Sequence, residues 1–193
     1  KSAVDSILRT MNFYGDETAS LTRLLDKQFA AIKYGAFSVT EFSRAIGNVL
    51  PLAKTAGTTL EEALAIFAIV SRGQKADEAA TSVKNFFSDF IQAYQDAIER
   101  AKKKTGEFSV GGILIKNEEG HLKTFTEFVE EIVKKYRELD EEGRLALEQS
   151  LNLKIRSLPA FQALMNNMEE YKQLLDELTV SENQFTEAYE TAA

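Results

Sequence analysis

Three short stretches of the sequence have the spacing of a capping box, a signal that starts an α-helix: Ser38–Glu41, Thr59–Glu62 and Thr124–Glu127. In such a box the side chains of the first and fourth residues each accept a hydrogen bond from the other residue's backbone N–H. Apolar residues recur at intervals of three and four over nearly the whole chain, which is the period of packed helices. The sequence therefore predicts a mainly α-helical protein built as an array of several helices.

The predicted helices end at glycines. Gly35 and Gly73 each terminate a helix, and we expect Gly73 to take the left-handed conformation that glycine adopts without strain. Gly57 stands before the second box, and Pro51 is expected to interrupt the helix before it. The helix after Thr59 is expected to bury one face, made of Leu60, Ala63, Leu64, Phe67 and Val70. The predicted helices cover about residues 4–14, 18–34, 38–56, 59–72, 76–104, 124–139, 140–151, 159 onward, 167–179 and 182 onward.

A weak internal repeat relates two parts of the N-terminal half. A shift of 38 residues places Phe29 on Phe67 and Gly35 on Gly73. Both copies have the order helix, glycine turn, helix. We therefore expect two similar helical hairpins that stack on each other, although two copies are too few for a solenoid.

The longest predicted helix covers about residues 76–104. Its apolar residues alternate steps of four and three and include Phe87, Phe90 and Tyr94, which is the spacing of a coiled-coil seam. Packing of this stripe against the rest of the same domain and self-association of two copies both explain the pattern. We favour the first.

Residues 106–123 differ from the rest because β-branched residues stand among glycines, and "NEEG", which ends at Gly120, is a good turn. We expect a small β-hairpin or an extended excursion near 108–123. It separates an N-terminal helical part, 1–105, from a C-terminal helical part, 124–193, within one elongated domain. Because the sequence opens at Lys1 rather than Met, we expect it to be a fragment of a longer protein.

The composition disfavours several classes of function. A net charge of −7 argues against a nucleic-acid surface, and no apolar run approaches the roughly 20 residues that span a membrane. With no Cys and His121 as the single histidine, the usual zinc sites and catalytic triads cannot be built. "AGTTLEEA" lacks the lysine and second glycine of a phosphate loop. We expect no catalytic residue, cofactor or metal, and an exposed loop position for His121.

The order of these parts resembles the core region of phage tail tape measure proteins. In that family an alanine-rich helix, a glycine-led helix start, a helix ending in Ser/Thr-x-Gly and an acidic Glu-Ala segment follow one another. A short glycine-containing excursion and further helices come next. The resemblance covers about residues 8–192. It departs at "LNLKIRSLPAF", where Leu151-Asn152 or Leu153-Lys154 stands in place of the family's Phe-Gly, which puts the local turn in doubt. The matching residues are Gly57, Glu61, Glu62, Ala63, Ser71, Gly73, Asp77, Glu78, Ala79, Ala80, Thr81, Gly112–Ile115 and Glu119–Leu122.

The resemblance implies a structural, non-enzymatic phage or prophage tail component. Such proteins are long and helical, lie inside the tail tube, set tail length and are thought to leave through the tip during DNA delivery. Implied partners are further copies and tail tube, tip or assembly chaperone proteins, in the virion tail and, during assembly, the host cytoplasm. The alternative is a helical adaptor domain that binds partner helices. The residues expected to matter structurally are Gly35, Gly57, Thr59, Glu62, Gly73, Phe87, Phe90, Tyr94 and Gly120.

Overall fold

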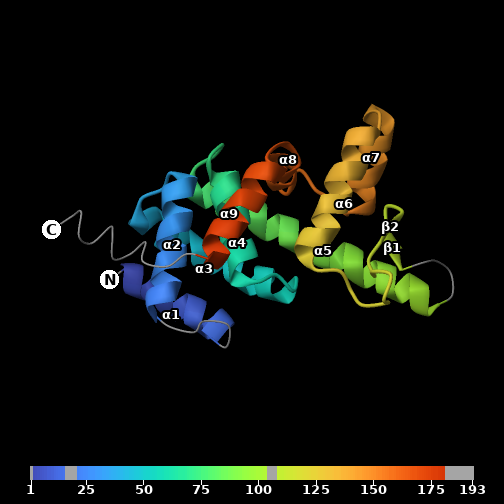
Figure 1. Cartoon of the computed structure of the whole chain (residues 1–193). Coiled ribbons are helices and arrows are strands. Elements are labelled where there is room, and N and C mark those ends of the chain that lie inside the picture. Colours follow the sequence, from blue (N-terminus) through green and yellow to red (C-terminus); the bar gives the residue numbers. More distant parts are fainter. Residues whose placement is uncertain (1, 16–20, 104–107, 181–193) are drawn as a thin grey trace.

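The computed structural model describes residues 2–15, 21–103 and 108–180. Within these residues the chain forms nine α-helices and one two-stranded sheet, which confirms the mainly α-helical fold (Figure 1). The predicted helix from residue 182 and the predicted helix ends at Thr18 and Lys104 lie outside the described residues. The elements are α1 (Ser2–Tyr14), α2 (Leu21–Gly35), α3 (Val39–Thr55), α4 (Leu60–Ser71), α5 (Ala76–Lys102), β1 (Ser109–Val110), β2 (Ile113–Leu114), α6 (Phe125–Glu138), α7 (Glu141–Ser150), α8 (Leu158–Asn166) and α9 (Met168–Val180).

All three predicted capping boxes form, at the starts of α3, α4 and α6. In the first, the backbone N–H of Glu41 donates to Ser38 Oγ over 3.2 Å, and the backbone N–H of Ser38 donates to Glu41 Oε2 over 2.9 Å. The boxes that start at Thr59 and Thr124 have the same reciprocal bonds. Each box satisfies backbone N–H groups that have no partner inside the helix, so these helix starts are set by local sequence.

The two helix pairs related by the 38-residue repeat, called the stacked hairpins below, are α2 with α3 and α4 with α5. α4 packs against α5, whereas α2 and α3 make few direct contacts, so the expected close packing within a hairpin is found only in the second pair. Equivalent helices are neighbours, since α2 contacts α4 and α3 contacts α5. α1 packs on α3, and α5 extends beyond this cluster toward the sheet, α6 and α7 (Figure 1). α8 and α9 then return to pack against α4. The hydrophobic core therefore combines helices from the first and last parts of the described chain.

α4 is the central helix of the described structure, with α2, α3, α5, α8 and α9 as neighbours. Every residue from Glu62 to Ser71 is buried. The expectation of one buried face is therefore wrong for this helix. Ile66 and Ile69, which lie outside the predicted face, are as buried as Phe67, because other helices cover α4 all round.

The predicted interruption at Pro51 is wrong, since α3 continues to Thr55. Proline removes one backbone hydrogen bond from a helix interior. Val49, Leu50 and Ala53, on either side of Pro51, are fully buried between neighbouring helices. Tertiary packing of these side chains holds the helix together across the missing bond.

The glycines that were predicted to end or separate helices differ in backbone conformation. Gly57 and Gly120 have φ angles of +78° and +83°, in the left-handed region. Gly73 is not among the described residues with positive φ, so its predicted left-handed conformation is wrong, and α4 has already ended at Ser71. α2 does end at Gly35, but the left-handed residue is the next one, Ala36, with φ +56°.

The excursion after α5 is a hairpin, as expected. Val110 pairs with Ile113 across Gly111 and Gly112, so the tight turn is at these glycines. The chain then folds back a second time through the "NEEG" turn, which places Lys116 opposite Leu122. Residues 106 and 107 of the predicted excursion lie outside the described residues.

The departure from the family pattern at Leu151-Asn152 keeps its turn. Asn152 has φ +56° directly after α7 and takes the left-handed position. Asparagine tolerates this conformation better than most residues, so a turn can form here without glycine.

Candidate functional site

The predicted residues Thr59 and Glu62 belong to a partly buried polar cluster, in which Glu62 is buried and Thr59 is exposed. We call Thr59, Glu62, Thr126 and Tyr171 the Glu62 joint. Glu62 Oε2 accepts from the backbone N–H of Thr59 over 2.8 Å. Glu62 Oε1 accepts from the backbone N–H and the hydroxyl of Thr126, over 3.2 and 2.5 Å. One carboxylate thus joins the start of α4 to the start of α6.

The electrostatics of the Glu62 joint follow from the two helix starts. The N-terminus of a helix carries partial positive charge, and here two N-termini approach one carboxylate. Glu62 is 5% exposed, and a buried carboxylate without hydrogen bonds would be strongly destabilising. Three donors and two helix dipoles compensate for this burial. The arrangement is a structural link between helices.

Tyr171 connects α9 to the same joint. Its hydroxyl lies 2.8 Å from Thr126 Oγ1. Because the Thr126 hydroxyl donates its proton to Glu62, the Tyr171 hydroxyl is the donor in this contact. Burial raises the pKa of Tyr171 far above its ordinary value, so the phenol remains a neutral donor at physiological pH.

A second buried carboxylate, Asp89 of α5, holds the loop between α7 and α8. Asp89 Oδ2 accepts from Ser157 Oγ over 2.7 Å and from the backbone N–H of Lys154 over 3.2 Å. Lys154 Nζ lies 3.1 Å from Asp89 Oδ1. Both oxygens of this 3% exposed residue are therefore used to fix the chain before α8.

The predicted aromatic residues of α5 come together with the start of α6. The ring centroids of Phe87 and Phe90 lie 5.6 and 4.9 Å from that of Phe125. The Tyr94 ring is 5.1 Å from Phe128 in an edge-to-face arrangement. Burial raises the pKa of the Tyr94 hydroxyl. The stripe on α5 therefore packs against its own chain, as favoured above.

An apolar groove of about 480 Å³ lies beside this aromatic cluster. Its walls come from the α3–α4 corner at Gly57, the outer side of α5 and the segment before α6. Ile91, Tyr94 and Ile98 line it from α5, and Leu122, which is 56% exposed, lines it from the opposite side. It can accept an apolar side chain.

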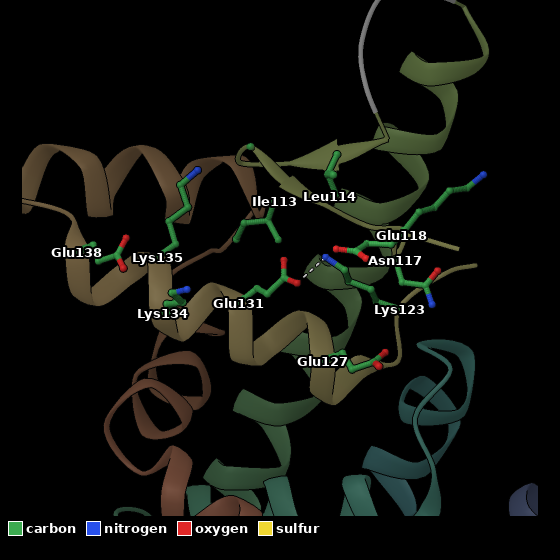
Figure 2. A pocket seen from close by; sticks show the side chains of 12 residues that line it. Ile113, Leu114, Asn117, Glu118, Lys123, Glu127, Glu131, Lys134, Lys135 and Glu138 are labelled. Atoms are coloured by element: carbon green, nitrogen blue, oxygen red, sulfur yellow. Dashed lines mark hydrogen bonds and ion pairs between the residues drawn. The ribbon is translucent and has the colours of Figure 1, made fainter. Parts of the chain in front are cut away.

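A larger groove of about 790 Å³ lies between the hairpin and α6 and is lined mainly by charged side chains. Figure 2 shows Lys123 directed toward Glu131, and their Nζ and Oε1 atoms are 2.6 Å apart. Lys135 Nζ donates to the carbonyl oxygen of Gly111 over 2.6 Å, which ties α6 to the tight turn. These contacts hold the hairpin on α6.

His121 lies at the end of the "NEEG" turn with a side chain that is 78% exposed, as expected of a loop histidine. Its backbone N–H donates to Asn117 Oδ1 over 2.9 Å, and its Nδ1 atom is 3.6 Å from Glu119. Gly120 closes the same turn by donating to the carbonyl oxygen of Asn117. This segment is a surface turn.

The sequence analysis did not identify Thr126, Tyr171, Asp89 or Ser157. Thr126 and Tyr171 carry no local signal, because their partners lie 64 and 45 residues away in the chain. Asp89 does carry one, since it interrupts the apolar run of "NFFSDF" on the buried side of α5. An acid in a buried stripe indicates a polar partner elsewhere in the fold.

Two further observations concern the described residues as a whole. In these ranges no three His, Cys, Asp or Glu side chains are grouped closely enough to hold a metal ion. None of the described helices combines the length and the apolar character needed to cross a membrane.

Comparison with known proteins gives one assignment. Residues 1–151 match a family model described as phage-related minor tail protein. No curated protein and no solved structure matches the chain significantly. The matched stretch includes α1 to α7 and therefore the two stacked hairpins, the sheet and two of the three helices joined through Glu62. Because the match covers well over half of the sequence, the chain belongs to the family of phage-related minor tail proteins.

Proposed function

We propose that the chain is part of a phage tape measure protein and contributes to tail assembly, tail length determination and genome delivery. The observation that carries this proposal is the phage tail family match over residues 1–151. The order of parts described above supports the finer assignment to a tape measure protein. We place the chain in the folded core region, distinct from the long ruler segments, in the virion tail and, before that, in the host cytoplasm.

We further propose that the role is non-enzymatic and depends on helix packing. Two buried acids support this view, because Glu62 and Asp89 both use their carboxylate oxygens to bind helix starts and a loop. Such carboxylates stabilise the fold. The partners we propose are further copies of the chain and tail tube, tip or assembly chaperone proteins.

An in-frame deletion of this region from the parent phage gene tests the proposal. We expect particles without tails or with tails of altered length in electron micrographs, and a loss of infectivity. Supplying the intact gene in trans should restore both, which controls for effects on neighbouring genes. Normal tails of unchanged length together with full infectivity would overturn the assignment.

The same experiment separates this proposal from the helical adaptor alternative. The apolar groove beside Tyr94 is the feature that favours an adaptor, because it can receive side chains of a partner helix. An adaptor of cellular proteins predicts normal tail morphology after the deletion. A tape measure component predicts defective tails.

A further inference from the structure

The turn between α7 and α8 presents an apolar residue to solvent. The backbone N–H of Ser157 donates to the carbonyl oxygen of Lys154 over 2.9 Å, which closes a four-residue turn. Ile155 and Arg156 are the two central residues of this turn, and both are exposed, Ile155 to 87%. We call residues 154–157 the Ile155 turn.

Buried polar contacts fix the Ile155 turn in place. Asp89 of α5 accepts hydrogen bonds from the backbone N–H of Lys154 and from the hydroxyl of Ser157. A segment that is fixed before it binds loses little conformational entropy on binding. Leu145 of α7, which is 55% exposed, lines the same surface hollow as Ile155. The turn therefore carries part of an apolar patch on a rigid support.

The apolar groove beside Tyr94 is a receptor of matching polarity. Ile91, Tyr94 and Ile98 line it from α5, and the exposed Leu122 lines it from the opposite side. Its volume of about 480 Å³ holds an isoleucine side chain together with the aliphatic stem of a neighbouring arginine. A turn that enters the groove covers Leu122 and its own apolar residue at once, and the burial of both surfaces favours binding.

An acid stands at the edge of the apolar groove. Thr124, which lines the groove, donates its hydroxyl to Glu127 Oε2 over 3.0 Å, and Glu127 is exposed on α6 (Figure 2). Burial raises the pKa of the Tyr94 hydroxyl, and the carboxylates of Glu131 and Glu127 raise it further, so both acids act at the groove wall. Lys123 also lines the groove, but its charge is paired with Glu131. A base that arrives at this edge therefore meets the carboxylate of Glu127.

The Ile155 turn and the apolar groove lie on opposite sides of α5. Asp89 holds the turn, and Ile91 and Ile98 of the groove follow it by two and nine residues, which places them about 160–180° around the helix. A chain therefore cannot insert its own turn into its own groove. Two surfaces of matching polarity and opposite charge are thus available only to different copies of the chain.

We propose that the Ile155 turn of one copy binds in the apolar groove of the next copy, with Ile155 in the groove and Arg156 paired with Glu127. Complementary charges at the edge of the contact set its orientation. The contact joins two different surfaces, so it extends into a ring or an open row of copies. This inference rests on the proposed function, because it names the surfaces through which further copies of the chain, proposed there as partners, bind each other.

Two variants each disable one surface and leave the other intact. Ile155→Asp changes the turn and Leu122→Lys changes the groove, and both positions are exposed, so the fold should be retained. Analytical ultracentrifugation of the purified chain should show self-association that each variant weakens by at least about tenfold. The matched control is Val180→Asp, which changes an exposed residue at the end of α9 and should associate as the unmodified chain does.

Mixing the two variants separates this contact from every symmetric one. The Ile155→Asp chain keeps its groove and the Leu122→Lys chain keeps its turn, so an equimolar mixture should form a one-to-one complex that does not grow further. A mixture that stays monomeric while the unmodified chain associates would overturn the inference. So would an unmodified chain that remains monomeric up to about 1 mM.

A further variant covers the case in which a charged substitution unfolds the chain, which circular dichroism detects. Arg156→Glu at the exposed corner of the turn places like charges together and should weaken self-association, most strongly at low salt. Association that is insensitive to this change and to salt would contradict the pairing with Glu127.

Failure of this contact is distinguishable from failure of the tail function. Defective tails after the deletion, together with self-association that neither Ile155→Asp nor Leu122→Lys weakens, would reject the contact and retain the tail function. Normal tails after the deletion would reject the tail function, whatever the purified chain does in the ultracentrifuge.

Discussion

Gly35 and Gly73 occupy equivalent positions in the two hairpins, but their surroundings differ. A Cβ atom at Gly35 would overlap the ring of Phe37 and lie 2.7 Å from Ser71 Oγ. At Gly73 the nearest atom would be 4.0 Å away, in ordinary van der Waals contact. The absence of a side chain is therefore required at Gly35 and not at Gly73.

We predict opposite effects of alanine at these two positions. Gly35→Ala should lower the free energy of unfolding by about 1–3 kcal/mol, because the buried neighbours must move apart. Gly73→Ala should be neutral or stabilise by up to about 1 kcal/mol, because alanine reduces the entropy of the unfolded chain. Urea unfolding followed by circular dichroism measures both. Equal losses at the two sites would show that both glycines are required for the same reason.

Tyr171 makes the free energy of unfolding depend on pH in the alkaline range. Burial raises the pKa of Tyr171 in the folded state. The contribution of this shift to the free energy of unfolding is therefore complete below the ordinary tyrosine pKa, about 10, and is lost as the pH rises above it. We expect the unmodified chain to lose about 1.4 kcal/mol more per pH unit above pH 10 than Tyr171→Phe does. Urea unfolding at pH 8, 10 and 11 measures this difference. Parallel losses in both proteins would contradict it.

At the residue scale, local signals predicted turns better than the surroundings of a residue. The "NEEG" turn at Gly120 was predicted from adjacent residues alone. The need for glycine at Gly35 comes from the ring of Phe37, two residues later, and from Ser71 on α4, and the contact with Ser71 depends on the tertiary fold. The same limit explains why Thr126 and Tyr171 were not identified.

At the scale of elements, the three capping boxes are the same local motif in different surroundings. Those of Glu41 and Glu127 are exposed, and hydrogen bonds from Ser38 and Thr124 lower the pKa of each carboxyl. In the third box the side chain of Glu62 is buried, and its carboxylate also binds the start of α6. The motif predicts the helix start in each case, whereas the additional link depends on the tertiary fold.

We predict that glutamine is tolerated differently at Glu62 and Glu127. A glutamine at the fourth position can still cap its own helix with its single side-chain oxygen. At Glu62 both oxygens accept hydrogen bonds, so the amide NH₂ of Glu62→Gln must face a donor, at a cost of about 1–3 kcal/mol. Glu127→Gln should have a smaller effect. Thermal unfolding of both variants measures the difference. Equal stability of the two variants would contradict a stabilising link between α4 and α6 through Glu62.

Helix boundaries were predictable because caps and glycines act within a few residues of the chain. The all-round burial of α4 was missed although the sequence indicates it, because the unbroken apolar run at residues 63–70 is typical of a helix that is covered on all sides. The continuity of α3 through Pro51 was also missed, because the packing of Leu50 and Ala53 outweighs the local preference.

At the scale of the whole molecule, the parts are held together by contacts between distant segments. α5 joins the stacked hairpins to α6 and α7, and its aromatic residues Phe87 and Phe90 form the centre of that connection. The stacking of the hairpins was suggested by the internal repeat. The return of α8 and α9 to α4 carries no sequence signal, because it depends on which apolar surfaces remain uncovered after the rest has folded.

The most direct test introduces a charge into the aromatic contact between α5 and α6, by mutating the gene in the phage genome. Phe87→Asp introduces an unpaired carboxylate at a fully buried position, which we expect to unfold the region. Gln92→Asp introduces the same group at an exposed position of α5 and serves as the control. Electron micrographs should show defective tails for Phe87→Asp and normal tails for Gln92→Asp. Normal, infectious tails with Phe87→Asp would contradict a tail function that depends on these packed helices.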